Sequence, residues 1–131
     1  MLVKLPVRKS DKWGEGHFGA PRGDHTHHGI DLACYPGSEI LSLSYGTVTK
    51  LGYPYSDDLS FRYVEITDEE DLKLRYFYVF PNSLAVGDII HQGQNIGISQ
   101  NLFERYPGIT GHVHFEIMDQ RGSYIDPTDF L

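Results

Sequence analysis

Alternating apolar and polar residues form the main pattern of this chain, and they predict strands rather than helices. Residues 40–51 alternate leucine with serine, turn at a glycine and continue as an apolar, β-branched run, which is typical of a hairpin. Residues 61–67 give a second strand signal. Residues 72–80 keep a strict period of two, which predicts one straight strand. The apolar face of that strand would carry Leu72, Leu74, Tyr76, Tyr78 and Phe80.

Turn residues divide the rest of the chain. Short strand signals stand at residues 89–91 and 112–118, and the glycines and proline of residues 99–111 predict a loop between them. The first 30 or so residues follow no period, because glycine and proline interrupt them. We find no internal repeat and no convincing amphipathic helix. The pattern therefore predicts a mainly β fold, a single antiparallel β-sheet domain over residues 1–131.

Composition narrows the possible partners. The chain has 131 residues, 14 of them glycine and 7 proline, and its net charge of −7 makes nucleic acid and anionic membrane surfaces poor partners. No apolar stretch approaches the roughly 18 residues of a membrane span. The single cysteine, Cys34, excludes an intramolecular disulfide, and we expect a small buried side chain there. The first residues lack the features of a secretory signal, so we expect synthesis in the cytosol.

Two histidine clusters are the candidate chemistry. His112 and His114 are two residues apart on a predicted strand, so both side chains point to one face. His27 and Asp31 are too far apart on a straight strand to share an ion, but Gly29 between them can supply a bend. Catalytic zinc takes three ligands of these types and keeps a position for water. Spacing alone leaves both a metal site and solvated surface histidines open.

Several segments together resemble one known family. They occur in order as residues 18–22, 27–32 (His-His-Gly-Ile-Asp-Leu), 36–48, 87–97, 111–117 (Gly-His-Val-His-Phe-Glu-Ile) and 125–127. The second and fifth match the His-x-Gly-x-Asp and His-x-His motifs of the lysostaphin/LytM zinc metallopeptidases almost residue for residue. The ordered set covers most of the chain, which makes it far more specific than any single motif.

The resemblance implies a site and an activity. It implies that His27, Asp31 and His114 bind Zn²⁺, and that His112 is a general base or a hydrogen-bond partner of the water and the transition state. A slipped register would instead place His25 or His28 at the metal. The family's fold is an antiparallel β-sheet domain with a groove across the sheet, and its activity is endopeptidase cleavage of peptidoglycan cross-links or stem peptides.

One departure from the family pattern affects catalysis. The family usually has a further catalytic histidine in a Tyr-x-His-Leu segment, where this chain has Tyr78 or, in a shifted alignment, Phe80. A tyrosine can donate a hydrogen bond to a developing oxyanion but is no base near pH 7. Losing one such donor costs about 10²–10³ in rate. We therefore predict Tyr78 as a second catalytic residue beside His112. Tyr53, Tyr55 and Tyr106 are candidate groove-lining side chains, and His91, Lys73 and Arg75 are interpreted as surface residues.

Two functions follow. The first is a zinc-dependent peptidoglycan endopeptidase, favoured because all three ligands and His112 are present. The second is a zinc-bearing but inactive domain that serves as a structural or regulatory module and binds wall peptides or a protein partner. The substrate lies outside the cytosol, so a phage lysin, a virion-borne protein or a dedicated export partner would be needed to bring the domain to the bacterial wall.

Overall fold

Strands make up most of the regular structure in the computed structural model, which describes residues 5–9, 11, 13–22 and 25–131. A short 3₁₀ helix, η1, covers Pro127–Phe130. In chain order the strands are β1 (Pro21–Arg22), β2 (His25–Thr26), β3 (Ile30–Ala33), β4 (Glu39–Leu41), β5 (Gly46–Gly52), β6 (Tyr63–Asp68), β7 (Lys73–Phe77), β8 (Val79–Pro81), β9 (Ile89–Ile90), β10 (Asn95–Ser99), β11 (His112–Met118) and β12 (Tyr124–Ile125).

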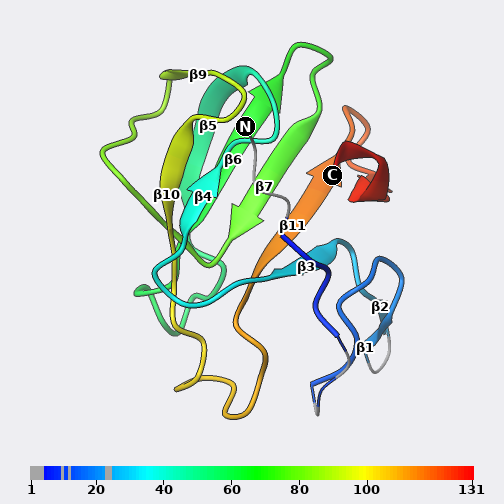
Figure 1. Cartoon of the computed structure of the whole chain (residues 1–131). Coiled ribbons are helices and arrows are strands. Elements are labelled where there is room, and N and C mark those ends of the chain that lie inside the picture. Colours follow the sequence, from blue (N-terminus) through cyan, green and yellow to red (C-terminus); the bar gives the residue numbers. More distant parts are fainter. Residues whose placement is uncertain (1–4, 10, 12, 23–24) are drawn as a thin grey trace.

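The described strands form three sheets (Figure 1). The largest has the order β12-β11-β7-β6-β5-β9, and β3 pairs with the outer edge of β11. The second has the order β4-β10-β8, and β1 pairs with β2 alone. Every pairing between these strands is antiparallel. The predicted mainly β, antiparallel fold is confirmed, although its strands divide among several sheets.

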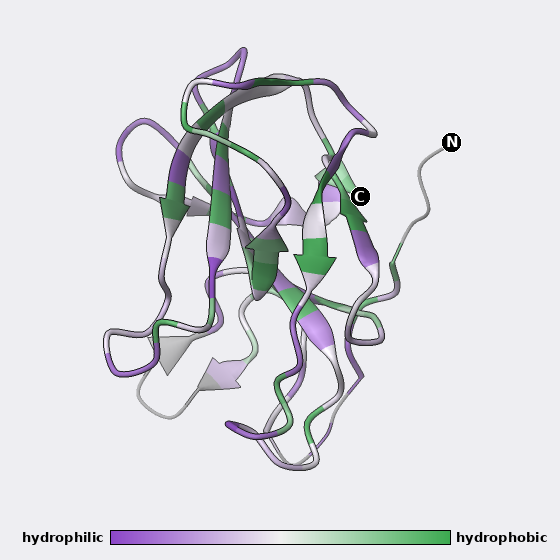
Figure 2. Ribbon diagram, turned by 90° about the vertical axis from the view of Figure 1, so that its left-hand side faces the viewer, coloured by the Kyte–Doolittle hydropathy of each residue, from purple (hydrophilic) through white to green (hydrophobic). Residues whose placement is uncertain are grey.

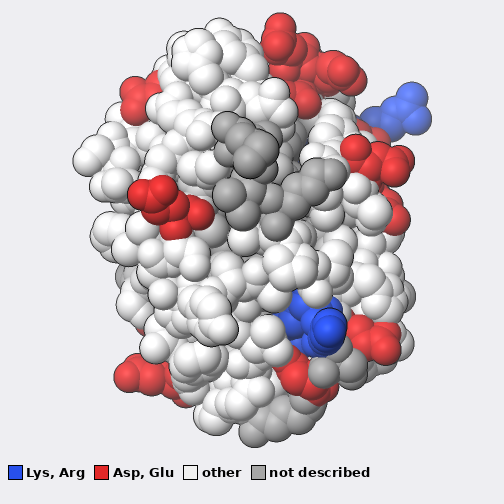
Figure 3. Space-filling view, in the orientation of Figure 1, with Lys and Arg blue, Asp and Glu red and all other residues white. Residues whose placement is uncertain are grey.

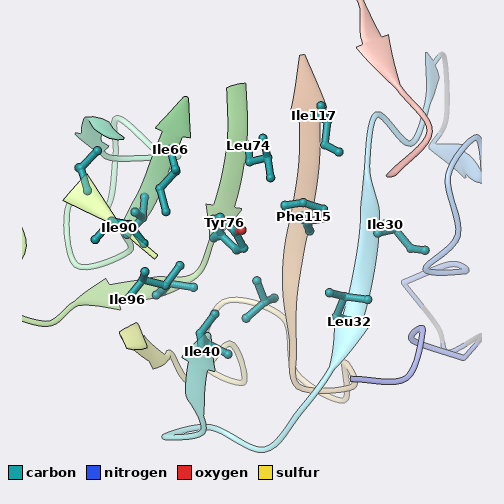
Figure 4. Close-up of a cluster of buried hydrophobic side chains, with 14 residues drawn as sticks. Ile30, Leu32, Ile40, Ile66, Leu74, Tyr76, Ile90, Ile96, Phe115 and Ile117 are labelled. Carbon is teal, nitrogen blue, oxygen red and sulfur yellow. The ribbon is translucent and has the colours of Figure 1, made fainter. Parts of the chain in front are cut away.

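The core lies on one face of the large sheet, and the period of two explains which residues enter it. Along β11, Val113, Phe115 and Ile117 are buried in the core, and Leu74 and Tyr76 of β7 lie beside them. Figure 4 shows these side chains with those of β3 and of the smaller sheet. Green and purple segments alternate along the strands in Figure 2. The side chains between the core positions therefore point to the opposite face, where the candidate site lies.

The predicted single strand over residues 72–80 is wrong. Tyr78 has a positive φ of 67°, so the chain leaves the large sheet after β7 and enters the smaller sheet as β8. Tyr76 is therefore a core residue at 2% exposure, whereas Phe80 is 50% exposed. Tyr78 packs against a second apolar cluster, formed by Phe61, Leu102 and Ile109. Period two continues in the sequence through a residue whose backbone breaks it in space.

Surface charge agrees with the composition. On the face shown in Figure 3, acidic side chains are spread around the molecule and basic ones form no broad patch among the residues described. Within the described part of the chain, no helix has the length and apolar character needed to span a membrane.

Gly29 allows β3 to approach β11. The chain bends at His28 and Gly29, as predicted, so that His27 turns toward Asp31. A Cβ atom at Gly29 would lie 2.3 Å from the Phe115 carbonyl oxygen and 3.0 Å from the His114 Cε1 atom. The glycine is thus required by close backbone packing as well as by the bend.

We predict that Gly29→Ala lowers the free energy of unfolding by about 1–3 kcal/mol, because the added methyl group must push β3 away from β11. Chemical denaturation of the metal-free protein measures this. A change of only a few tenths of a kcal/mol would show that the two strands do not need this close approach.

Candidate metal centre

Strand pairing brings the predicted ligands together. His114 on β11 is the direct cross-strand partner of Asp31 on β3. Both side chains point away from the core, because their neighbours along each strand fill it. His27 reaches the same point from the bend before β3. His27 and Asp31 are 7% and 3% exposed.

The three side chains present a triangle of acceptor atoms. His27 Nε2 lies 2.9 Å from His114 Nδ1. Asp31 Oδ1 lies 3.0 Å from His114 Nδ1 and 3.2 Å from His27 Nε2. Ligand atoms about 2.0–2.1 Å from a tetrahedral zinc ion stand roughly 3.3 Å apart. The triangle therefore has nearly the size of one face of a zinc tetrahedron, and these residues could hold such an ion.

The far side of each ligand is also bound. His27 Nδ1 donates to the His17 carbonyl at 3.0 Å, and His114 Nε2 donates to Glu116 Oε1 at 2.9 Å. Each ring therefore keeps its proton on the outer nitrogen and turns a lone pair toward the centre. The second carboxylate oxygen of Asp31 accepts a hydrogen bond from Arg8 Nε at 3.0 Å. All three ligands are held in orientation before any ion arrives.

Convergent lone pairs shift the proton affinities in the direction that a cation site requires. Burial alone would lower the pKa of His114, but hydrogen bonds to Asp31 and Glu116 outweigh it and raise the pKa to about 9. Burial would raise the pKa of Asp31, yet hydrogen bonds with His114 and His27 hold it well below its usual range. A positive charge at the centre, carried by a proton or a metal ion, is thus strongly favoured.

His112 lies beside the triangle and outside it. Its Nδ1 donates to the Thr110 carbonyl at 2.8 Å, which leaves the lone pair on Nε2. That Nε2 lies 3.6 Å from Asp31 Oδ2. Burial lowers the pKa of His112 below its usual value. The ring is therefore neutral near pH 7 and able to accept a proton.

Tyr78 lies next to His112, with the two rings edge to face and 5.6 Å between their centroids. Its hydroxyl is 2.8 Å from that of Tyr55, which is 2.6 Å from that of Tyr106. Burial raises the pKa of Tyr78 above its usual value, so the hydroxyl stays protonated. Three hydroxyl hydrogens serve two mutual contacts, so one hydrogen is left to donate outward. Either end of the row can supply it.

A cleft of about 400 Å³ joins these groups. The triad, His112 and Tyr78 line it, together with Tyr55 and Tyr106 as predicted. Tyr53 is not among the lining residues, and its ring lies under Arg62 with 4.4 Å between the guanidinium carbon and the ring centroid. The cleft is an open depression on the face of the sheet opposite the core.

Alternative ligands do not join the triangle. The His28 ring stacks on Tyr124 with 4.2 Å between centroids. Cys34 is half-buried, which raises the pKa of its thiol, and it is not part of the described cluster that could hold a metal. The side chain of His25 lies outside the described residues. A slip of the register to His28 is therefore not supported.

Two functional neighbours were missed by the sequence interpretation. Glu116 was left out, although the spacing 112, 114, 116 puts it on the same face, and it binds His114. Arg8 gave no signal, because it lies 23 residues before Asp31. The interpretation of Arg75 as a surface residue is wrong: its side chain is 19% exposed and pairs with Glu65 at 2.7 Å and Glu116 at 3.5 Å.

Comparison with known proteins identifies the family. A profile of peptidase family M23 matches residues 25–127, which include all four site residues other than Arg8 and Glu116 discussed as ligands or base: His27, Asp31, His112 and His114. The chain belongs to peptidase family M23. Among its relatives, this M23 domain is 28% identical to mouse leukocyte cell-derived chemotaxin-2 over 125 residues, covering 95% of this chain and 79% of that protein.

Solved M23 structures share the fold. The catalytic domain of the antimicrobial peptidase lysostaphin from Staphylococcus simulans aligns with a TM-score of 0.68, 22% identity and 89% coverage of each chain. A substituted form of the catalytic domain of the prophage-encoded M23 protein EnpA from Enterococcus faecalis aligns with a TM-score of 0.67 and 24% identity, covering 98% of this chain and 93% of that one. The fold predicted from the resemblance is thereby confirmed.

We predict that the purified M23 domain binds about one zinc ion per chain, and that His27→Ala, Asp31→Ala and His114→Ala each abolish binding, since three ligands leave little redundancy. Elemental analysis after dialysis measures the content. His28→Ala, which alters a histidine of the same cleft outside the triangle, is the matched control and should keep the metal. Stoichiometric zinc in any ligand variant would mean that the ligand set is wrong.

Proposed function

We propose that this M23 domain is a zinc-dependent endopeptidase that hydrolyses peptide bonds in the cross-links or stem peptides of bacterial peptidoglycan. The observation that carries the proposal is the triangle of His27 Nε2, His114 Nδ1 and Asp31 Oδ1 with the lone pair of His112 beside it. Membership of peptidase family M23 and the fold shared with the antimicrobial peptidase lysostaphin support the same assignment.

The chemistry divides between the ion and the protein. Zinc, when bound by the triad, supplies a Lewis acid and lowers the pKa of a coordinated water to near 7. His112 is neutral and buried, with Nε2 open to accept the proton of the attacking water and return it to the leaving amine. The open cleft lets an extended peptide lie across the site.

Tyr78 is proposed as the hydrogen-bond donor to the oxyanion that forms during attack. In one arrangement of the three hydroxyls, Tyr106 donates to Tyr55 and Tyr55 donates to Tyr78, so that the Tyr78 hydrogen faces the cleft. Each bond in such a row polarises the next and makes the last donor stronger. Because its pKa is raised, Tyr78 donates a hydrogen bond rather than acting as a base.

A second function is supported by two observations. Tyr78 stands where the resemblance to the lysostaphin/LytM peptidases implies a histidine, and a curated relative of this chain is named as a chemotaxin rather than as a peptidase. The second candidate is therefore a catalytically impaired zinc-binding domain that serves as a structural or regulatory module for a wall peptide or a protein partner. Delivery by a phage virion or an export partner stays a prediction.

We predict that His112→Ala keeps its zinc but loses about 10²–10⁴ in turnover, because the change removes a general base and no ligand. Digestion of purified bacterial walls and zinc content are measured on the same preparation. His91→Ala, an exposed histidine, is the control for both readouts. Equal zinc loss in His112→Ala and His114→Ala would overturn this division of roles.

We predict that Tyr78→Phe lowers turnover by about 10–10³-fold with unchanged zinc content, since one hydrogen-bond donor is lost. Turnover on a cleavable wall peptide is the measurement, and Tyr35→Phe on the exposed surface is the control. A Tyr78→Phe rate equal to wild type would leave Tyr78 as a packing residue. Tyr78→His restores the usual family residue, and histidine tolerates the positive φ at this position better than most side chains do. Activity that appears only in Tyr78→His would favour the impaired domain.

A further inference from the structure

We propose that the segment Leu5–Gly16, which precedes the part of the chain matched by the M23 profile, is a built part of the metal centre, and that Arg8 is a positioning residue for Asp31. The inference rests on the proposed zinc site. The described residues of this segment, 5–9, 11 and 13–16, contact Asp31 on one side and the loop before His112 on the other.

Backbone hydrogen bonds fasten the segment to β3 at the metal ligand itself. Arg8 N donates to the Asp31 carbonyl at 2.7 Å, and Asp31 N donates to the Gly16 carbonyl at 2.7 Å. Ala33 N donates to the Pro6 carbonyl at 2.6 Å. A Cβ atom at Gly16 would lie 2.6 Å from Arg8 Cβ, so the two limbs of the segment pack closely. Asp31 thus gains backbone partners from residues outside the family match.

The Arg8 side chain is almost fully enclosed, at 3% exposure, and its donors are distributed around it. Nε binds Asp31 Oδ2 at 3.0 Å, Nη1 binds Asp11 Oδ1 at 2.8 Å and the Gly14 carbonyl at 3.0 Å, and Nη2 reaches the Glu15 carbonyl at 3.4 Å. With Oδ2 held by Arg8, Asp31 can turn only Oδ1 toward His27 and His114. The guanidinium therefore sets which oxygen is offered to the ion.

A positive charge so near a cation site would by itself weaken metal binding. Asp11 counters this effect, because its carboxylate lies on the opposite side of the same guanidinium. Burial would raise the pKa of Asp11, but hydrogen bonds from the Thr110 backbone and Arg8 lower it to about 2, so the carboxylate is ionised. Arg8 and its two carboxylates together carry one negative charge. The positioning effect is thus obtained without making the centre positive.

The same segment continues to His112. Asp11 Oδ2 accepts from Thr110 N at 2.9 Å, and the Thr110 carbonyl accepts from His112 Nδ1 at 2.8 Å. Trp13 adds a second tie to this loop, since its Nε1 donates to the Pro107 carbonyl at 3.0 Å. One network therefore runs from a metal ligand, through Arg8 and Asp11, to the residue proposed as the base.

The test is zinc affinity, measured by competition with a chelating indicator for the whole chain and its variants, with circular dichroism confirming the fold. Arg8→Met should bind zinc about 10–100-fold more weakly than wild type, the range found when a partner of a ligand is removed. Arg8→Lys keeps a charge but has no planar fork, so its affinity should be intermediate. Arg121→Met, in an exposed turn, should bind as wild type does.

The outcomes separate the two proposals. Folded Arg8→Met with wild-type affinity would overturn the role of Arg8 and leave the zinc site intact. If Arg8→Met does not fold, Arg8→Lys decides: reduced thermal stability with unchanged zinc affinity means a purely structural arginine and overturns the inference. A wild-type chain that binds no zinc would overturn the proposed function and this inference together.

Discussion

The pairing of β3 with β11 is the interaction on which the candidate site depends, because it sets Asp31 directly opposite His114. The same register places Ile30 and Leu32 in the core beside Phe115, so one set of hydrogen bonds fixes both packing and ligand geometry. A slip of one residue would turn Asp31 into the apolar core and the leucine toward the cleft. The hydrophobic core therefore enforces the register that the site needs.

Sequence alone could predict the parts of the site that depend on local periodicity. The spacing of His112 and His114 placed both on one face, and the bend at Gly29 was inferred because His27 and Asp31 could not otherwise meet. Tyr78 shows where this reasoning failed, because alternation in the sequence does not reveal a left-handed backbone residue between two sheets. Arg8 was invisible for another reason, since its contact with Asp31 joins distant segments.

Buried charges around the triad explain its rigidity. Glu65, Arg75 and Glu116 are neighbours across β6, β7 and β11, and this row ends at His114 Nε2. Arg8 holds Asp31 from the opposite side. Charges removed from water are costly unless each is paired, and here each is bound to a partner of opposite sign. Folding therefore brings together three acceptor atoms whose mutual repulsion a bound cation would relieve, which couples metal binding to stability.

The central claim is that the fold builds a zinc site from three specified atoms, and anomalous diffraction at the zinc edge tests it most directly. Crystals grown with zinc should show one ion at about 2.0–2.2 Å from His27 Nε2, His114 Nδ1 and Asp31 Oδ1. Glu116 should still accept from the outer nitrogen of His114, and His112 should lie near the ion without ligating it. An ion held through His114 Nε2, through His112 or away from this triangle would contradict the account.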